Sequence, residues 1–271
     1  MSMTPRSDRA LLPRLFPRNW SLWLDGLAIA AWGILLLKYW LTGKLRILIH
    51  PAYTWLCVVG GIGLLAMGGL KLWEVWQIQR QNQARGNGLA GMPEAQHVTL
   101  LPSGGSAMLL LVVAIIGLMS TPRAFASQTA MERGVTELLS ATRSQPQRFR
   151  SAKKPEERSL LDWVRTLNVY PEPDAYAGQN AKVQGFVIPA PESWSDGYFI
   201  VSRFVITCCA ADAYPVGLPV KLTGDLSAYP PDTWLDVEGT IVTETLDETR
   251  KLVIQASAIS EIPEPKNPYD Y

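Results

Sequence analysis

The chain has 271 residues, 48% of them hydrophobic, and a formal net charge of +1 at pH 7. That length corresponds to roughly one or two domains. A nearly neutral net charge gives no reason to expect nucleic acid as a partner, because phosphate contacts need a strongly basic patch. Three cysteines are too few for a disulfide framework, and the two histidines, His50 and His97, exclude a histidine-rich metal site.

The composition changes along the chain. Residues 1–126 contain long apolar runs and are predicted to form a transmembrane region. Residues 127–168 are predicted to be a helical connector and linker, and residues 169–271 a soluble β domain. The expected protein therefore holds a small folded domain against a membrane, with membrane lipid as one partner.

The first predicted span is Trp20–Leu41. Its 22 residues cross a hydrocarbon core of about 30 Å at about 1.5 Å per residue, and aromatic residues stand at both ends. Asp25 lies near its start. A carboxylate inside a membrane is often functional, but about one turn separates Asp25 from Trp20, which favours a solvated group at headgroup depth.

The second predicted span covers residues 54–76 and is rich in glycine, which permits close packing either on the first span or on a partner's helix. Cys57 is expected to be a small apolar filler in this span. The third apolar run, within residues 104–121, is short. We expect it to span, although a run of this length also fits a re-entrant segment or the core of a signal sequence.

Basic residues near the span ends predict the orientation. Seven lie in the N-terminal tail and second loop, against four on the other side: Arg6, Arg9, Arg14, Arg18, Lys71, Arg80 and Arg85 against Lys44, Arg46, Arg123 and Arg133. The N-terminus is therefore expected in the cytoplasm of a bacterial cell and, if the third run spans, the C-terminal domain outside it.

Between the membrane region and the β domain, the sequence predicts a helix over Thr129–Thr142, a linker over Ser144–Pro155 and a second helix that opens at Pro155. Five strand signals follow at regular spacing, separated by turn-rich pieces. They are Lys182–Pro189, Tyr198–Cys208, Val216–Thr223, Trp234–Glu244 and Lys251–Ile262.

Gly185 and Gly239 fall in mid-strand, where small barrels coil sharply or backbones approach closely. We predict an OB-like five-stranded barrel, with a five-stranded sandwich as the alternative. The strands show few basic residues interleaved with aromatics, so the barrel is not expected to bind nucleic acid.

The residues with most chemical potential are Cys208, Cys209 and Asp212. The sequence places the cysteines at the end of the second strand, where successive side chains point to opposite faces. One thiol would then face the core, and the outer thiol, with Asp212, would be a soft-metal ligand or a redox centre. Without such a role the pair is one core and one surface cysteine, and a lone Cys-Cys pair is a weak metal signal.

No catalytic motif is recognisable in the sequence, so we do not expect an enzyme. Both histidines fall outside the predicted β domain, which leaves the cysteines without a histidine base there. Arg203 is expected to pair with Asp212 or Asp225 in a structural role. The acids Asp236, Glu238 and Glu244 alternate along one strand and are expected to be solvated.

Several segments resemble one protein family. They are GFV (185–187), RFVITCCAADAYPVGLPV (203–220), DVEGTI (236–241) and, more loosely, LRILIHPAY (45–53). These runs are similar to the YcgQ-like family of uncharacterised bacterial membrane proteins, described as one subunit of a two-component membrane permease complex. The resemblance implies a multi-spanning permease as partner, but no substrate, cofactor or site residue.

Three functions follow as expectations. The first is an accessory permease subunit, with the Cys208, Cys209 and Asp212 group sensing an ion or a redox state. The second is a membrane-anchored thiol redox or metal-handling protein, which for redox chemistry needs a thiol of depressed pKa beside a cation such as Arg203. The third is a purely structural assembly subunit.

Overall fold

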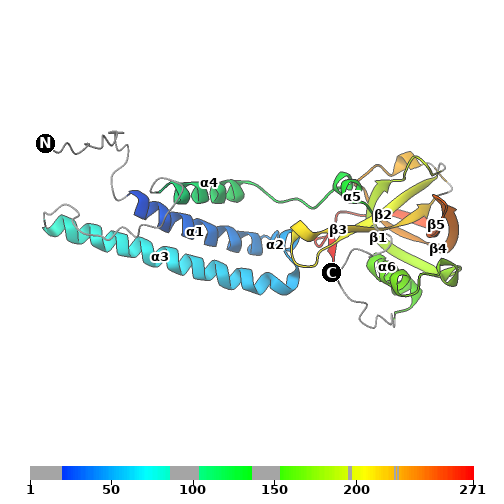
Figure 1. The fold of residues 1–271 in the computed structure, drawn as a ribbon, viewed down its shortest axis with the longest axis horizontal. Coiled ribbons are helices and arrows are strands. Elements are labelled where there is room, and N and C mark those ends of the chain that lie inside the picture. The colour runs from blue at the N-terminus through cyan, green and yellow to red at the C-terminus, as the bar shows by residue number, and fades with distance from the viewer. Residues whose placement is uncertain (1–19, 86–103, 136–152, 195–196, 223, 225) are drawn as a thin grey trace, which may run out of the picture. The chain divides into compact units, whose positions relative to one another are not determined.

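The computed structural model describes residues 20–85, 104–135, 153–194, 197–222, 224 and 226–271 (Figure 1). The chain divides into two compact units. The helical unit comprises residues 1–44 and 54–121, and the β unit comprises residues 45–53 and 122–271. The segment 45–53, between the first two long helices, thus belongs with the C-terminal domain.

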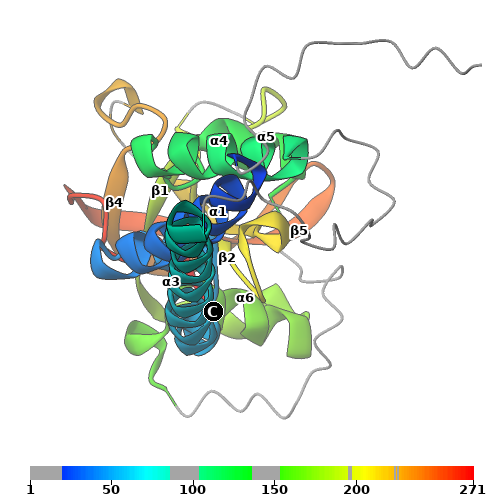
Figure 2. The same cartoon turned by 90° about the vertical axis from the view of Figure 1, so that its left-hand side faces the viewer.

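The helical unit contains α1 (Trp20–Leu41), α3 (Thr54–Arg85) and α4 (Gly105–Met119). Helix α1 lies between the other two (Figures 1 and 2). Among the described residues, two helices are long and apolar enough to cross a membrane, and α4 is a shorter apolar helix. Large apolar side chains are exposed along all three, as lipid contact requires.

Glycines bring α1 and α3 close together in an antiparallel pair. A Cβ added at Gly33 of α1 would meet the carbonyl oxygen of Gly61 at 2.9 Å, and one added at Gly68 of α3 would meet the backbone nitrogen of Ala30 at 2.9 Å. The glycine-rich span therefore packs on the first span of its own chain. Gly60 and Gly63 have open space where a Cβ would stand.

Helix α4 runs parallel to α1, because contacts progress in the same direction along both. About midway along α1, Trp32 donates its indole N–H to the carbonyl of Leu110 at 3.1 Å. Further on, Tyr39 donates its hydroxyl to the carbonyl of Gly117 at 2.6 Å, and Lys38 donates to the next carbonyl along α4. The two helices thus end at the same level.

The β unit is a closed five-stranded barrel, as the sequence predicted (Figure 1). Its strands are β1 (Asn180–Pro189), β2 (Tyr198–Val205), β3 (Tyr214–Lys221), β4 (Trp234–Leu246) and β5 (Thr249–Glu261). They pair in the order β1-β4-β5-β3-β2, and β2 returns to β1. All these pairs are antiparallel except β3 with β5.

The mid-strand glycines mark close approaches between strands. A Cβ at Gly185 would lie 2.5 Å from the carbonyl oxygen of Ser202, and one at Gly239 would lie 2.3 Å from that of Gln255. The β4–β5 ladder also shifts its register between Glu238 and Gly239. The predicted role of both glycines is thereby confirmed.

The β unit has two apolar core clusters, and helix α6 (Leu160–Val169) packs into one of them. Its apolar side chains are buried with the inner faces of the strands: Leu160, Leu161, Trp163, Val164 and Leu167. The helix starts at a capping box, in which Ser159 and Asp162 each accept the other's backbone N–H at 3.1 Å. The predicted helix at Pro155 is instead a 3-10 turn, Pro155–Glu157, followed by α6.

Other boundaries also differ from the predictions. The helix expected over Thr129–Thr142 is α5, Ser127–Arg133, which is capped by Gly134 with φ of 74°. Residues 136–152, which hold the end of the predicted helix and most of the predicted linker, lie outside the described residues. Strand β2 ends at Val205, before the cysteines, and a short strand that was not predicted, β6 (Tyr269–Asp270), pairs with it in parallel. A small helix, α2 (Leu45–Leu48), and a 3-10 turn, Pro51–Tyr53, complete the segment 45–53.

Candidate metal centre

Cys208 and Cys209 lie in the connection between β2 and β3. The backbone N–H of Ile206 donates to the backbone carbonyl of Asp270 at 3.1 Å. Pairing with β6 therefore continues one residue past β2 and then stops. A 3-10 turn, Ala210–Asp212, follows the cysteines and leads into β3. The pair therefore sits on a tight turn at one end of the barrel.

Asp212 shapes this turn. Its Oδ2 accepts the backbone N–H of Cys208 at 2.8 Å, and its Oδ1 accepts that of Cys209 at 3.1 Å. Asp212 is the N3 residue of a capping box, and its carboxylate reaches back to the amide of the N-cap residue Cys209. Folding the carboxylate back onto the two amides brings it beside both thiols.

The structure gathers the three candidate ligands in one place. Both sulfur atoms and a carboxylate oxygen of Asp212 lie within 4.8 Å of one another, with 3.6 Å between the two sulfurs. Cys208 is exposed and Cys209 is half-buried, and both are free thiols. The expectation that they point to opposite faces was wrong, because they stand on a turn and not on a strand.

Electrostatics at the turn oppose a reactive thiolate. The hydrogen bond to the Asp212 carboxylate and the neighbouring Cys209 thiol raise the pKa of Cys208 to about 11. Burial acts to raise the pKa of Asp212, but hydrogen bonds from the amides of Cys208 and Cys209 outweigh it, and that pKa lies below its usual value. At neutral pH Asp212 is ionised and Cys208 carries its proton.

Arg203 is engaged elsewhere, which corrects its predicted pairing. Its guanidinium lies 3.4 Å from Asp270 and donates to the carbonyls of Asn267 and Pro268. It thus fastens the C-terminal strand β6 to β2, and it does not pair with Asp212. Asp225 lies outside the described residues.

The other predicted polar residues are not part of this turn. Asp25 belongs to the helical unit, where its Oδ2 lies 3.9 Å from Nζ of Lys71 on α3. Among the strand acids, Glu238 pairs with Lys182 at 2.5 Å, and Glu244 accepts hydrogen bonds from Tyr198 and from Lys221. Asp236 accepts a hydrogen bond from Gln184 at 3.2 Å. The acids were predicted to be solvated, but Asp236 and Glu244 are half-buried and all three have structural partners.

Sequence reasoning missed His50. It counted both histidines outside the β domain, but residues 45–53 belong to the β unit, and the backbone N–H of His50 donates to the carbonyl of Cys208 at 3.0 Å. The isolated bridge between Ile49 and Cys209 lies beside that bond. Local sequence patterns carry no signal for a contact across more than 150 positions. His97 lies outside the described residues.

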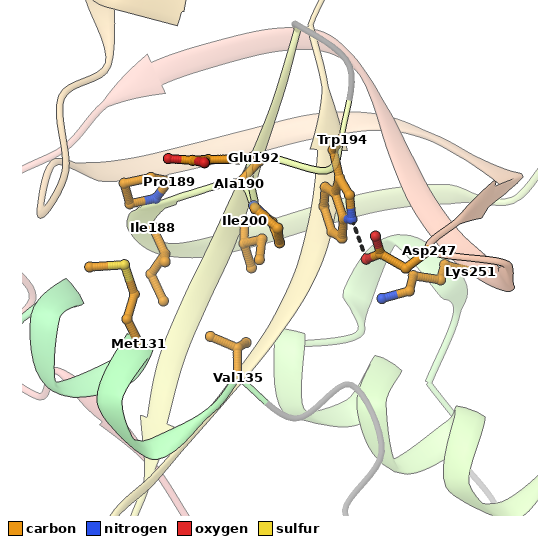
Figure 3. A pocket seen from close by; sticks show the side chains of 11 residues that line it. Met131, Val135, Ile188, Pro189, Ala190, Glu192, Trp194, Ile200, Asp247 and Lys251 are labelled. Atoms are coloured by element: carbon orange, nitrogen blue, oxygen red, sulfur yellow. Dashed lines mark hydrogen bonds between the residues drawn. The ribbon is translucent and has the colours of Figure 1, made fainter.

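A separate pocket of about 520 Å³ opens between α5 and the barrel (Figure 3). Its floor is apolar, formed by Met131 and Val135 on one side and Ile188 and Ile200 on the other. At its rim the Asp247 carboxylate already accepts hydrogen bonds from Trp194 and Ser193 at 2.6 Å. The pocket has no cysteine in its lining, so it is separate from the cysteine turn.

Comparison with known protein families matches residues 155–271 to the model of the DUF1980 C-terminal domain. Comparison with curated proteins and with solved structures gives no match. The matched segment contains α6, all the strands and the turn with Cys208 and Cys209. Residues 155–271 are therefore similar to the DUF1980 C-terminal domain, and this similarity supports an uncharacterised family for that part of the chain.

Proposed function

We propose that this protein is a membrane-anchored, non-catalytic subunit whose β domain binds a soft divalent metal ion at Cys208, Cys209 and Asp212. The observation that carries the proposal is the convergence of two sulfurs and a carboxylate oxygen within 4.8 Å at an accessible turn. Thiolate sulfur favours Zn²⁺ and other soft ions over Mg²⁺ or Ca²⁺. Three protein ligands leave one position of a tetrahedral Zn²⁺ open for exchange with a partner or with water.

The chemistry of the turn favours metal binding over thiol catalysis. A nucleophilic or redox-active cysteine needs a depressed pKa, commonly beside a cation. Here the pKa of Cys208 is raised, and Arg203 is bound to Asp270. A metal ion is not opposed by the negative charge of Asp212 as a free thiolate is. Its positive charge replaces the thiol proton and is attracted to the Asp212 carboxylate.

The 3.6 Å separation of the sulfurs also fits the redox alternative, in which the adjacent thiols form a disulfide. Two adjacent cysteines close such a ring only with a distorted peptide, so the oxidised form is expected to be strained. Mass spectrometry of the protein oxidised by diamide, with its thiols counted before and after, distinguishes this alternative. Loss of two thiols with no effect on Zn²⁺ binding would favour it.

The proposed membrane arrangement has three spans, and two observations support it. The segment 45–53 and the domain after residue 122 form one unit, so the chain leaves α1 and α4 on the same side of the membrane. Within the helical unit α4 runs parallel to α1. At 15 residues and about 1.5 Å per residue α4 is short for a span, which local thinning of the bilayer can accommodate. By the basic-residue bias the β domain then lies outside the cytoplasm of a bacterial cell.

The proposed partner is a multi-spanning permease in the same membrane. The resemblance of residues 185–187, 203–220, 236–241 and, more loosely, 45–53 to the YcgQ-like family implies it. The β domain would present its metal site at the mouth of that partner. Affinity purification of the tagged protein from native membranes in mild detergent, with mass spectrometry, tests this. A stoichiometric multi-spanning protein supports the accessory role, and purification without any membrane partner contradicts it.

Metal binding is tested separately, by Zn²⁺ titration of the purified full-length protein in detergent. We expect one Zn²⁺ per chain, and loss of that binding in the Cys208→Ser/Cys209→Ser variant. Cys57→Ser is the matched control, because it removes a thiol of the helical unit and should leave binding unchanged. Equal Zn²⁺ binding by wild type and the double variant would contradict the site.

A further inference from the structure

The cysteine turn is joined to the segment that connects two predicted membrane spans. Residues 45–53 follow α1 and precede α3 in the chain, yet they pack into the β unit. Leu45 is buried, and Ile47, 8% exposed, lies in a core cluster together with Phe204, Ile206 and Tyr269. The segment is thus a built part of the domain and not a free loop.

The connection to the site runs through the backbone of one residue, Cys208. The N–H of Cys208 is held by Asp212 at 2.8 Å, and the carbonyl of the same residue is held by the N–H of His50 at 3.0 Å. Next to it, Ile49 and Cys209 face each other in an antiparallel bridge. The backbone that presents the two thiols is therefore fixed from one side by the candidate ligand Asp212 and from the other by the segment 45–53.

The His50 ring serves this packing and is not one of the three side chains whose ligand atoms converge. Its Nδ1 accepts the backbone N–H of Ala52 at 3.1 Å. The ring also contacts Tyr271 edge to face, with 4.7 Å between centroids.

We propose that metal binding at Cys208, Cys209 and Asp212 is coupled to the docking of residues 45–53, so that the segment reports occupancy of the site to α1 and α3. The inference rests on the proposed metal binding. An ion held by all three side chains would clamp the turn in the conformation that pairs with Ile49 and His50. Coupling of this kind is reciprocal: Zn²⁺ stabilises the docked segment, and the docked segment strengthens Zn²⁺ binding.

Hydrogen-exchange mass spectrometry of the full-length protein in detergent, with and without Zn²⁺, tests the first half of this coupling. We expect Zn²⁺ to slow exchange of the peptide that covers residues 45–53 by at least about fivefold, the lower end of typical coupling. The Cys208→Ser/Cys209→Ser variant should show no such change. Bound Zn²⁺ with unchanged exchange in this peptide would overturn the inference while leaving the proposed metal site intact.

The reciprocal test loosens the segment without touching a ligand. Ile47→Ala removes buried side-chain volume from the docked segment and should weaken Zn²⁺ binding by about fivefold or more. Val237→Ala is the control, since it removes volume from the other core, around α6. Equal Zn²⁺ affinity in the two folded variants would overturn the coupling, and absence of Zn²⁺ binding in wild type would overturn the proposed function itself.

Discussion

Asp212 acts on Cys208 in two opposite ways. Its carboxylate brings a third donor to the thiols, but its negative charge helps to raise the pKa of Cys208 to about 11, so that the free thiol keeps its proton. A metal ion must displace that proton to bind the sulfur. The residue therefore favours a bound cation while it suppresses the nucleophilicity of the empty site.

The first prediction concerns this effect on reactivity. Asp212→Asn removes the negative charge, which lowers the pKa of Cys208 and raises its thiolate fraction at pH 8. Alkylation of Cys208 by iodoacetamide, followed by mass spectrometry, should be several-fold faster than in wild type, while Zn²⁺ binding becomes weaker. An alkylation rate equal to that of wild type would contradict the proposed electrostatic link. Circular dichroism of both proteins controls for unfolding.

The second prediction is the pH dependence of binding. Because Cys208 is protonated across the neutral range, Zn²⁺ releases at least one proton when it binds. Zn²⁺ affinity should rise by at least about tenfold per pH unit between pH 6 and pH 8. A titration series in buffers that do not bind Zn²⁺ measures this slope. An affinity independent of pH would show that the Cys208 sulfur is not a ligand.

At the scale of single residues, the sequence predicted which side chains come together at the turn but not the direction in which the thiols point. Cys208, Cys209 and Asp212 are close in the chain, and an acid at the third position of a helical turn can reach back to the amide of the N-cap residue. The direction of the thiols depended on where β2 ends, and that depends on β6. Arg203 was assigned to nearby acids because its partner Asp270 lies 67 positions away in a strand that no local pattern announced.

At the scale of elements, the start of α6 depends on Asp162. Its side chain is 8% exposed, and its carboxylate accepts hydrogen bonds from Lys153 at 2.7 Å and from the backbone N–H of Ser159. Burial acts to raise the pKa of Asp162, yet these hydrogen bonds outweigh it and the pKa lies below the usual 3.8. A carboxyl whose pKa is lower in the folded protein than in the unfolded chain stabilises the fold at pH values above the unfolded pKa. That contribution is lost as the pH falls through the folded pKa.

The third prediction follows from the lowered pKa of Asp162. Asp162→Asn should lower the free energy of unfolding by about 1–3 kcal/mol at pH 7, since it removes the charged hydrogen bond to Lys153. The difference from wild type should shrink as pH falls below 4. Thermal unfolding in detergent at both pH values measures it, with Lys154→Ala as a control at an exposed neighbouring position. An equal loss of unfolding free energy in the variant at pH 7 and pH 3 would contradict the stabilising role of the ionised Asp162.

The fourth prediction concerns the close approach of β4 and β5. Gly239→Ala places a methyl group 2.3 Å from the carbonyl oxygen of Gln255, so the strands must separate, and we expect a loss of about 1–3 kcal/mol. Gly224→Ala is the matched control, because its Cβ would have no neighbour closer than 3.8 Å. Denaturant unfolding compares the two variants. Equal stability would show that the strands adjust freely at Gly239.

The elements themselves were largely predictable, and for physical reasons. Alternating strands, mid-strand glycines and the apolar stripe of α6 are local signals, and each corresponds to an observed element. Element ends were less predictable, since they depend on distant partners. Strand β6 is an example, for its two residues have no strand pattern and are held by β2 and Arg203.

For the molecule as a whole, the largest change from the sequence-based prediction is the place of residues 45–53. Hydropathy assigns them to a short connection between two spans, and nothing local distinguishes a free connection from a docked one. Their burial with Phe204 and Tyr269 makes them part of the β unit. Together with the parallel course of α1 and α4, this supports the proposal of three spans.

The fifth prediction tests that topology. In a protein without its native cysteines, Lys44→Cys and Ser120→Cys should react with a membrane-impermeant maleimide added outside intact cells. Gln81→Cys should react only after the membrane is permeabilised. Accessibility of Lys44→Cys and Ser120→Cys from opposite sides of the membrane would contradict the third span.

The central claim is the metal centre, and X-ray absorption spectroscopy of the Zn²⁺-loaded full-length protein tests it most directly. We predict two sulfur scatterers at about 2.3 Å together with oxygen ligands at about 2.0–2.2 Å, and loss of the sulfur shell in the Cys208→Ser/Cys209→Ser variant. A zinc spectrum with only nitrogen and oxygen ligands in the wild-type protein would contradict the claim.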